Sequence, residues 1–250
     1  MKLFYKLLGL LTFELLKHLG KKYRKVYPRM ALFADDTLSQ KLLVYGRYEK
    51  EYLECLEQYF LKIMDPDKIC LDLGANLGNH ALSFSPYFKH VHAFEPNKRT
   101  FKLLSYNVGL ESNISAHNFG ASNKNAIYKA TERIGNQGAS SIIQAGEQEI
   151  DYIEYDCRIL DDYLPSEVIN KIGFVKIDVE GHELQALQGI IRILERSSPL
   201  IAFELLKDGI TSGKSPVIDF LKEHGYHEFF ELYKINPVQV RSEGNTYFSH

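Results

Sequence analysis

The chain has 250 residues, of which 45% are hydrophobic and 25% charged, a composition typical of globular proteins with one or two domains. Its net charge of −2 lacks the basic footprint of nucleic-acid-binding proteins, so we expect no nucleic acid partner. The three cysteines, Cys55, Cys70 and Cys157, are not spaced like metal ligands, and they favour a reducing compartment and therefore a cytoplasmic location.

The first 25 residues are rich in leucine but carry charges at Lys6 and Glu14. The uncharged run between them, Leu7 to Phe13, is much shorter than the roughly 20 residues needed to cross a bilayer. Spacings of three and four predict an amphipathic helix with an apolar stripe made by Phe4, Leu8, Leu11, Leu15 and Leu19. We expect this stripe to pack on the main domain. The alternative is a peripheral membrane contact through residues 1–25, at the inner face of the membrane.

Residues 1–40 are thus predicted to form a helical arm and a connector, residues 41–235 the main domain, and residues 236–250 a tail or a final strand. Within the domain, strand-like runs alternate with helical ones. The predicted strands are Lys68–Leu73, His90–Phe94, Ile114–Phe119, Gly173–Ile177 and Leu200–Leu205. The predicted helices are Tyr48–Leu61, Asn79–Phe88, Asn97–Val108 and His182–Leu194. This alternation predicts an α/β fold, with a mostly parallel, Rossmann-like sheet covered by helices on both faces.

The alternation lapses between Phe119 and Leu164. This stretch contains the Gly/Ser-rich run GNQGASSI (Gly135 to Ile142) and a polar strand-like run, IDYIEYDCRIL. An insertion of this length is either a lid or binding loop, or a surface hairpin, and the sequence leaves both interpretations open.

The run ICLDLGANLGNH, Ile69 to His80, passes from an apolar strand through a glycine loop to a predicted helix, an arrangement that suits a charged cofactor. A dinucleotide fingerprint would read G-x-G-x-x-G, whereas Gly74 and Gly78 are separated by three residues. Asp72, just before the loop, would repel a pyrophosphate but suits a ligand with an amino group. Loop N–H groups would then bind the carboxylate of that ligand.

Glu95 ends the second predicted strand, 21 residues after Gly74. An acid at this position can accept hydrogen bonds from both ribose hydroxyl groups of a nucleoside cofactor. The spacing is common to proteins that bind NAD and to those that bind adenosyl cofactors. In combination with Asp72, it favours S-adenosyl-L-methionine.

Five motifs occur in the order YGRYEKEYLECL, CLDLGANLGNH, HAFEPN, FVKIDVEGHELQALQG and PLIAFEL. Together they resemble the FkbM-type methyltransferase family over about Leu43 to Tyr233. The resemblance implies a class I methyltransferase fold that uses S-adenosyl-L-methionine, commonly to methylate an oxygen of a sugar or natural product. It also implies that the methionine end of the cofactor is bound by Asp72, Gly74, Ala75, Asn76 and Gly78. Glu95 then corresponds to the ribose acid, and Ala121, in FGASN, to a backbone contact with adenine.

Methylation of an aliphatic hydroxyl group needs a general base, because the proton must leave as the methyl group arrives. Asp178, Glu180 and His182 follow the fourth predicted strand, and Glu204 follows the fifth. These four are the candidate catalytic residues, with Asp178 and Glu180 preferred over His182. We favour a reaction without a metal. The alternative is Mg²⁺ held by Asp178, Glu180 and Glu204, since this ion takes oxygen ligands.

The sequence therefore predicts an S-adenosyl-L-methionine-dependent O-methyltransferase that acts on a hydroxyl group of a small molecule or glycan. Two alternatives belong to other classes. A cofactor-binding assembly subunit without transfer activity would not need the acidic cluster. An NAD(P)-dependent oxidoreductase is disfavoured by the incomplete glycine pattern and by Asp72.

Overall fold

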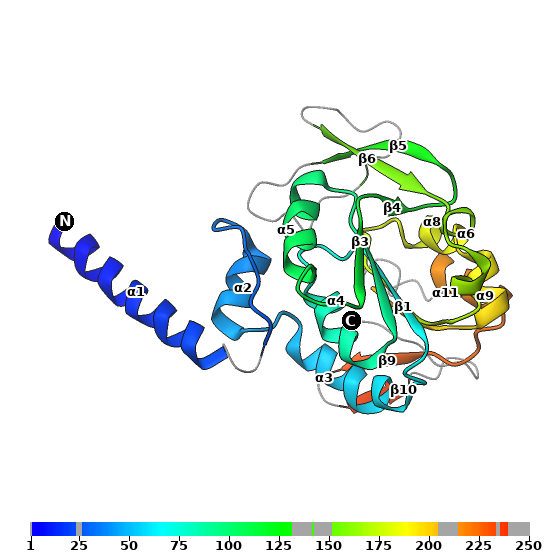
Figure 1. Ribbon diagram of the computed structural model, residues 1–250, viewed down its shortest axis with the longest axis horizontal. Coiled ribbons are helices and arrows are strands. Elements are labelled where there is room, and N and C mark those ends of the chain that lie inside the picture. The colour runs from blue at the N-terminus through cyan, green and yellow to red at the C-terminus, as the bar shows by residue number, and fades with distance from the viewer. Residues whose placement is uncertain are drawn as a thin grey trace.

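The computed structural model describes residues 2–23, 27–131, 142, 152–204, 215–233 and 236–239. A five-stranded sheet forms its centre, with strand order β3-β2-β1-β7-β8 and every neighbouring pair parallel (Figure 1). The strands are β1 (Ile69–Leu73), β2 (His90–Phe94), β3 (Ile114–His117), β7 (Ile172–Ile177) and β8 (Leu200–Phe203). The predicted parallel α/β sheet is confirmed.

The strand order places the ligand site. From the central strand β1 the chain moves outward through β2 to β3, and it then returns to the other side of β1 as β7 and β8. The order therefore reverses between β1 and β7. In open α/β sheets, ligands bind outside the carboxyl ends of the strands at such a point.

Helices cover both faces of the sheet. One face carries α3 (Lys50–Tyr59), α4 (Asn79–Phe84), α5 (Lys98–Val108) and the short 3₁₀ helices η1 (Leu61–Ile63) and η2 (Ser85–Tyr87). The other carries α6 (Leu160–Tyr163), α7 (Ser166–Ile169), α8 (Glu183–Gln188), α9 (Ile191–Ser197) and α11 (Pro216–Glu223). A hydrophobic core lies on each face of the sheet, and β1 contributes to both. Leu71 and Leu73 pack in the core under α6, α7, α8, α9 and α11, whereas Cys70 packs in the core under α3, α4 and α5. Alternation along the strand explains this division.

The predicted helix His182–Leu194 is wrong as a single element, because it is broken into α8 and α9 at Gly189. A Cβ atom at Gly189 would collide with the main-chain carbonyl group of Ser122. The break therefore lets a distant part of the chain approach the helix backbone, a contact that helical periodicity does not reveal.

The stretch after β3 forms a second sheet with strand order β4-β6-β5. Its strands are β4 (Gly120–Ala121), β5 (Ala126–Thr131) and β6 (Tyr152–Arg158). Strands β5 and β6 are antiparallel, so the hairpin interpretation is confirmed for this part. Of the predicted Gly/Ser-rich loop, only Ile142 lies within the described residues, and it pairs with Ala130.

The N-terminal arm consists of α1 (Lys2–Tyr23), which contacts α2 (Thr37–Tyr45). The predicted domain boundary at residue 40 falls inside α2. Figure 1 shows α1 extending away from the rest of the molecule. Residues 3–18 are all exposed, so the expectation that the apolar stripe packs on the main domain is wrong.

No helix in the described residues combines the length and apolar character that crossing a bilayer requires. At the other end of the chain, β9 (Phe230–Tyr233) pairs antiparallel with β10 (Asn236–Gln239). Strand β10 lies in the segment for which the sequence predicts a tail or a final strand.

Candidate active site

A pocket lies at the carboxyl ends of β1, β2 and β7, with the β4-β6-β5 sheet as one wall. It includes seven of the residues predicted from the sequence: Gly74, Asn76, Glu95, Ala121, Asp178, Glu180 and His182. The other lining residues are Pro96, Thr100, Gly120, Ile142, Tyr155, Cys157 and Val179. Tyr155 and Cys157 of β6, in the predicted insertion, thus contribute to the pocket, and the binding-loop interpretation stays a prediction.

The loop after β1 is shaped by its backbone. Gly74 has a φ of 78°, and a Cβ atom there would collide with the carbonyl oxygen of Asp178. Only glycine fits this close approach between β1 and the end of β7. The N–H groups of Gly74 and Ala75 both donate to the carbonyl group of Phe94, at 3.0 and 2.9 Å. These two amides are therefore occupied, contrary to the expectation that loop N–H groups bind a ligand carboxylate.

Glu95 sits at the tip of β2 and is held by two main-chain donors. Its Oε2 accepts a hydrogen bond from the N–H of Asn76 at 3.0 Å, and its Oε1 accepts one from Asn97 at 2.8 Å. Burial raises the pKa of Glu95 to about 7, although both hydrogen bonds lower it. Each carboxylate oxygen can accept a further hydrogen bond, so Glu95 can bind two hydroxyl groups from the pocket side.

Asp72 is placed differently from the prediction. Its side chain is fully buried and does not line the pocket, because its carboxylate pairs with the ammonium group of Lys176 at 3.3 Å. Lys176 also lies 3.3 Å from Oδ2 of Asp178 and donates to the carbonyl oxygen of Gly74 at 3.0 Å. Burial lowers the pKa of Lys176, but the two carboxylates outweigh it and raise the pKa above its ordinary value.

Lys176 therefore connects the loop after β1 with the acids after β7. Sequence reasoning overlooked it, although a lysine inside the otherwise apolar run GFVKI was a signal. A charge in such a strand is rare unless it is paired.

Two other predicted cofactor residues have packing roles. Gly78 has a φ of 94° and begins α4, and a Cβ atom there would press on Leu104 and Val108 of α5 at 3.0 Å. Ala75 is buried in the core beside α4. Neither residue lines the pocket, so both shape the loop from behind.

The turn after β7 carries three candidate bases into the pocket. Glu180 has a φ of 52° and Gly181 a φ of 92°, which makes the turn tight. The Oε1 of Glu183 accepts hydrogen bonds from the N–H groups of Val179 and Gly181, at 3.3 and 3.1 Å. Glu183 thus holds the turn, and the side chains of Asp178 and Glu180 remain at the pocket.

His182 is fixed by a hydrogen-bonded chain. Its Nε2 lies 3.0 Å from the hydroxyl oxygen of Ser122, which in turn lies 3.0 Å from the hydroxyl oxygen of Tyr128. The ring of Tyr128 also packs edge-on against the imidazole. Burial and then the charge of Lys124 lower the pKa of His182, so the imidazole is neutral at neutral pH.

Glu204 is not a pocket-lining residue, although it follows the neighbouring strand β8. Burial, and then the charges of Asp178 and Glu49, raise its pKa to about 7. Within the described residues, no group of three or more His, Cys, Asp or Glu side chains is arranged to hold a metal ion.

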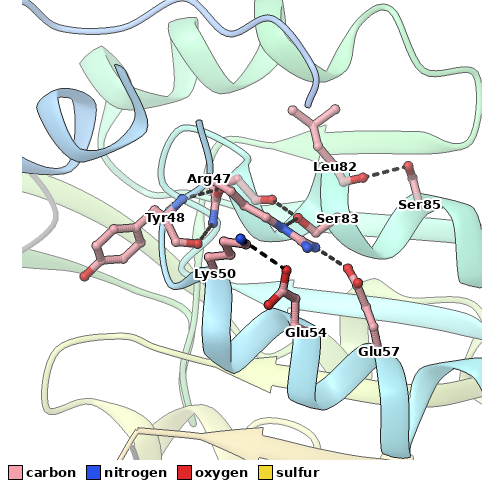
Figure 2. A network of polar contacts seen from close by, with 9 residues as sticks. Arg47, Tyr48, Lys50, Glu54, Glu57, Leu82, Ser83 and Ser85 are labelled. Atoms are coloured by element: carbon pink, nitrogen blue, oxygen red, sulfur yellow. Dashed lines mark hydrogen bonds and ion pairs between the residues drawn. The ribbon is translucent and has the colours of Figure 1, made fainter. Parts of the chain in front are cut away.

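Glu49 is a second residue that sequence reasoning overlooked. It precedes α3, and its carboxylate lies 3.0 Å from Nε2 of His80. Figure 2 shows how the adjoining residues are tied down: Arg47 pairs with Glu57 and donates to Ser83 at 3.2 Å. The motif YGRYEKEY, which contributes to the family resemblance, was the available signal.

Strained backbone gathers around this region. Among the described residues, four other than glycine have a positive φ; two of them, Asn76 and Glu180, line the pocket, and a third, Glu49, precedes α3. Such conformations cost about 1–3 kcal/mol each and are often found at functional sites. Their positions support the assignment of this region as the active site.

Comparison with known proteins agrees with the geometry. Residues 72–228 match the family model described as the methyltransferase FkbM domain. The hexuronic acid methyltransferase AglP of Haloferax volcanii is 31% identical over 137 residues, which cover 54% of this chain and 55% of that protein. The chain thus aligns with about half the length of this curated relative.

Two solved structures resemble the fold. One is a methyltransferase FkbM from Methylobacillus flagellatus KT, with a TM-score of 0.42 and 18% identity, covering 77% of this chain and 48% of that one. Another is a precorrin-6y C5,15-methyltransferase from Geobacter metallireducens GS-15, with a TM-score of 0.44 and 16% identity, covering 81% and 78%. The family model spans more than half of the chain, and the protein belongs to the FkbM methyltransferase family.

Proposed function

We propose that the protein transfers a methyl group from S-adenosyl-L-methionine to a hydroxyl group of a sugar, within a glycan or a natural product. One observation carries the proposal: a single pocket is lined by the loop after β1, by Glu95, and by the acids and histidine that follow β7. Membership of the FkbM family and the name of the Haloferax relative, a hexuronic acid methyltransferase, support methyl transfer to a sugar.

The residues of the pocket fit this cofactor. Glu95 presents free acceptor sites for the two ribose hydroxyl groups, and its carboxylate is already oriented by Asn76 and Asn97. Ala121, on the far wall, is the proposed contact to adenine. The methionine end then lies along Gly74 and Asn76, towards Asp178. When bound, the cofactor supplies an electrophilic methyl group on a sulfonium sulfur.

Asp178, Glu180 and His182 are the proposed bases. Asp178 is anchored by Lys176, so its carboxylate is held in place at the end of β7. His182 is neutral and therefore able to accept a proton, and Ser122 orients it. Either kind of group can take the hydroxyl proton as the methyl group is transferred, which typically contributes 10²–10⁴-fold to the rate. Asp178 and Glu180 remain the preferred candidates.

The acceptor is proposed to be a sugar because the named activity of the Haloferax relative is that of a hexuronic acid methyltransferase, and the choice of a hydroxyl oxygen follows the resemblance to the FkbM-type family. The experiment has two parts. Calorimetry should detect binding of S-adenosyl-L-methionine and no binding of NAD⁺. Incubation with the cofactor and a panel of hexuronic-acid-containing glycans should then add 14 Da to one of them.

The outcomes separate the alternatives. Binding of NAD⁺ in place of S-adenosyl-L-methionine would overturn the cofactor assignment. Tight cofactor binding without transfer to any sugar, peptide or polyketide acceptor would instead favour an assembly subunit.

A further inference from the structure

Helix α1 exposes an unusual amount of apolar surface. Its large apolar side chains include Leu3 and Leu11, which are 79% and 63% exposed. The others that are exposed are Phe4, Tyr5, Leu7, Leu8, Leu10, Phe13, Leu15 and Leu16. A contiguous patch of this kind on a folded protein marks an interaction surface.

The N-terminal segment that contains α1 is also basic, whereas the rest of the protein is acidic. Residues 1–25 contain seven Lys or Arg residues and one acid, Glu14, for a net charge of +6. The whole chain has 30 basic and 32 acidic residues, which leaves 23 basic and 31 acidic ones, or −8, for residues 26–250. The surface that α1 contacts should therefore be both apolar and negatively charged.

A hollow at the base of the arm also combines basic and apolar side chains. It lies between α1 and α2, and its basic lining residues are Lys17, Lys21 and Arg29. The aromatic rings of Tyr23 and Tyr27 border the same hollow. In the described part of the chain, no acidic residue lines it. A phospholipid would suit this hollow, because its phosphate can pair with the basic residues and its acyl chain can contact the apolar ones.

We propose that α1 is a membrane-docking helix that lies in the surface of a bilayer containing anionic phospholipids. Its apolar side chains enter the acyl boundary, and its lysines, together with Arg29 at the base, bind lipid phosphates. A helix of 22 residues is about 33 Å long, enough to place several leucines in the interface along its axis. This proposal is independent of the proposed methyl transfer.

A second copy of the chain is a weaker candidate for the same face. Pairing two α1 helices, each with five lysines and one glutamate, would bring together two charges of +4, whereas an anionic bilayer neutralises that charge. Each basic residue near such a surface adds to the attraction. The charge therefore selects the lipid surface.

The test is sedimentation of the full chain with vesicles of phosphatidylcholine alone, or mixed 7:3 with phosphatidylglycerol. We expect at least about tenfold tighter binding to the anionic vesicles, and weaker binding when salt is raised. The double variant Leu8→Glu/Leu11→Glu should abolish the binding. Because both side chains are exposed, the variant should fold normally, which circular dichroism checks.

The matched control is Ile63→Glu/Leu110→Glu, which places two acids at exposed apolar positions of the main domain, each 82% exposed. It should bind vesicles like the unmodified chain. Equal loss in both variants would overturn the proposal, because the effect would then be one of net charge. Absence of binding to anionic vesicles would also overturn it. A third outcome would also overturn it: light scattering shows a dimer that Leu8→Glu/Leu11→Glu dissociates and the control does not, and the dissociated variant still binds vesicles.

Discussion

Lys176 of β7 pairs in register with Asp72 of β1, and their charged groups lie 3.3 Å apart in a fully buried position below the pocket. Lys176 also reaches Asp178, at the same distance. The ion pair therefore fixes the carboxyl end of β7 against that of β1, where the strand order reverses. It links the stability of the sheet to the position of a candidate base.

Lys176→Met should lower the free energy of unfolding by about 3–5 kcal/mol, because it leaves the carboxylate of Asp72 buried without a counter-charge. Urea unfolding measures the change. Adding Asp72→Leu to the same chain should restore part of the stability, since the stranded charge is then removed. If the double variant instead loses as much free energy of unfolding as the two single variants added together, this role is contradicted.

Glu95→Gln should weaken binding of S-adenosyl-L-methionine by about 1.5–3 kcal/mol, the range for hydrogen bonds to a charged group. The pKa of Glu95 is raised to about 7 by burial, so the carboxylate becomes ionised as the pH rises through 7. Cofactor affinity should therefore increase between pH 6 and 8 in the unmodified chain. Calorimetry across this range should give a flatter profile for the variant, and identical profiles would count against the ribose assignment.

Asp178→Asn, Glu180→Gln and His182→Gln each test a candidate base. The variant that removes the base should lower kcat by about 10²–10⁴-fold while cofactor affinity changes far less. Glu111→Gln is the control, because Glu111 is an exposed acid after α5 that does not line the pocket. Near-normal turnover in all three variants would refute the base assignment. Loss of activity with EDTA, restored by Mg²⁺, would instead favour metal ligation by these acids.

The half-buried His92 and His117 should make the protein sensitive to acid. Their rings are in contact, with Nδ1 of His92 3.0 Å from Nε2 of His117. Burial, and after it the charges of neighbouring histidines, lower the pKa of His92 to about 3 and that of His117 to about 4. The unfolded chain thus binds more protons below pH 6.5, and stability falls as the pH is lowered from there towards 4.

His92→Gln removes one of these titrating groups and keeps a polar side chain. Thermal unfolding between pH 7 and 4.5 should show a smaller loss of stability in this variant, by about 1–2 kcal/mol. His227→Gln is a suitable control, because it replaces a histidine that lies outside the ring cluster. An equal pH dependence in all three chains would contradict the explanation.

Local patterns in the sequence were sufficient to predict the sheet and the position of the pocket. Five short apolar runs, each followed by a loop or an acid, predicted parallel strands whose carboxyl ends meet, and the pocket lies there. Glu95 and Asp178 could be predicted to face the pocket in this way because each directly follows a strand. A strand end is a local feature of the chain, and parallel sheets gather such ends at one edge.

The tertiary structure decided which of these polar residues face the pocket. Asp72 turns to Lys176, about a hundred residues away, because the register of β1 against β7 puts them side by side, and no local pattern encodes that register. Gly189 breaks a helix because Ser122 approaches from another part of the chain. The apolar stripe of α1 can be predicted from the sequence. Its exposure cannot, because burial depends on which surfaces meet in the folded chain.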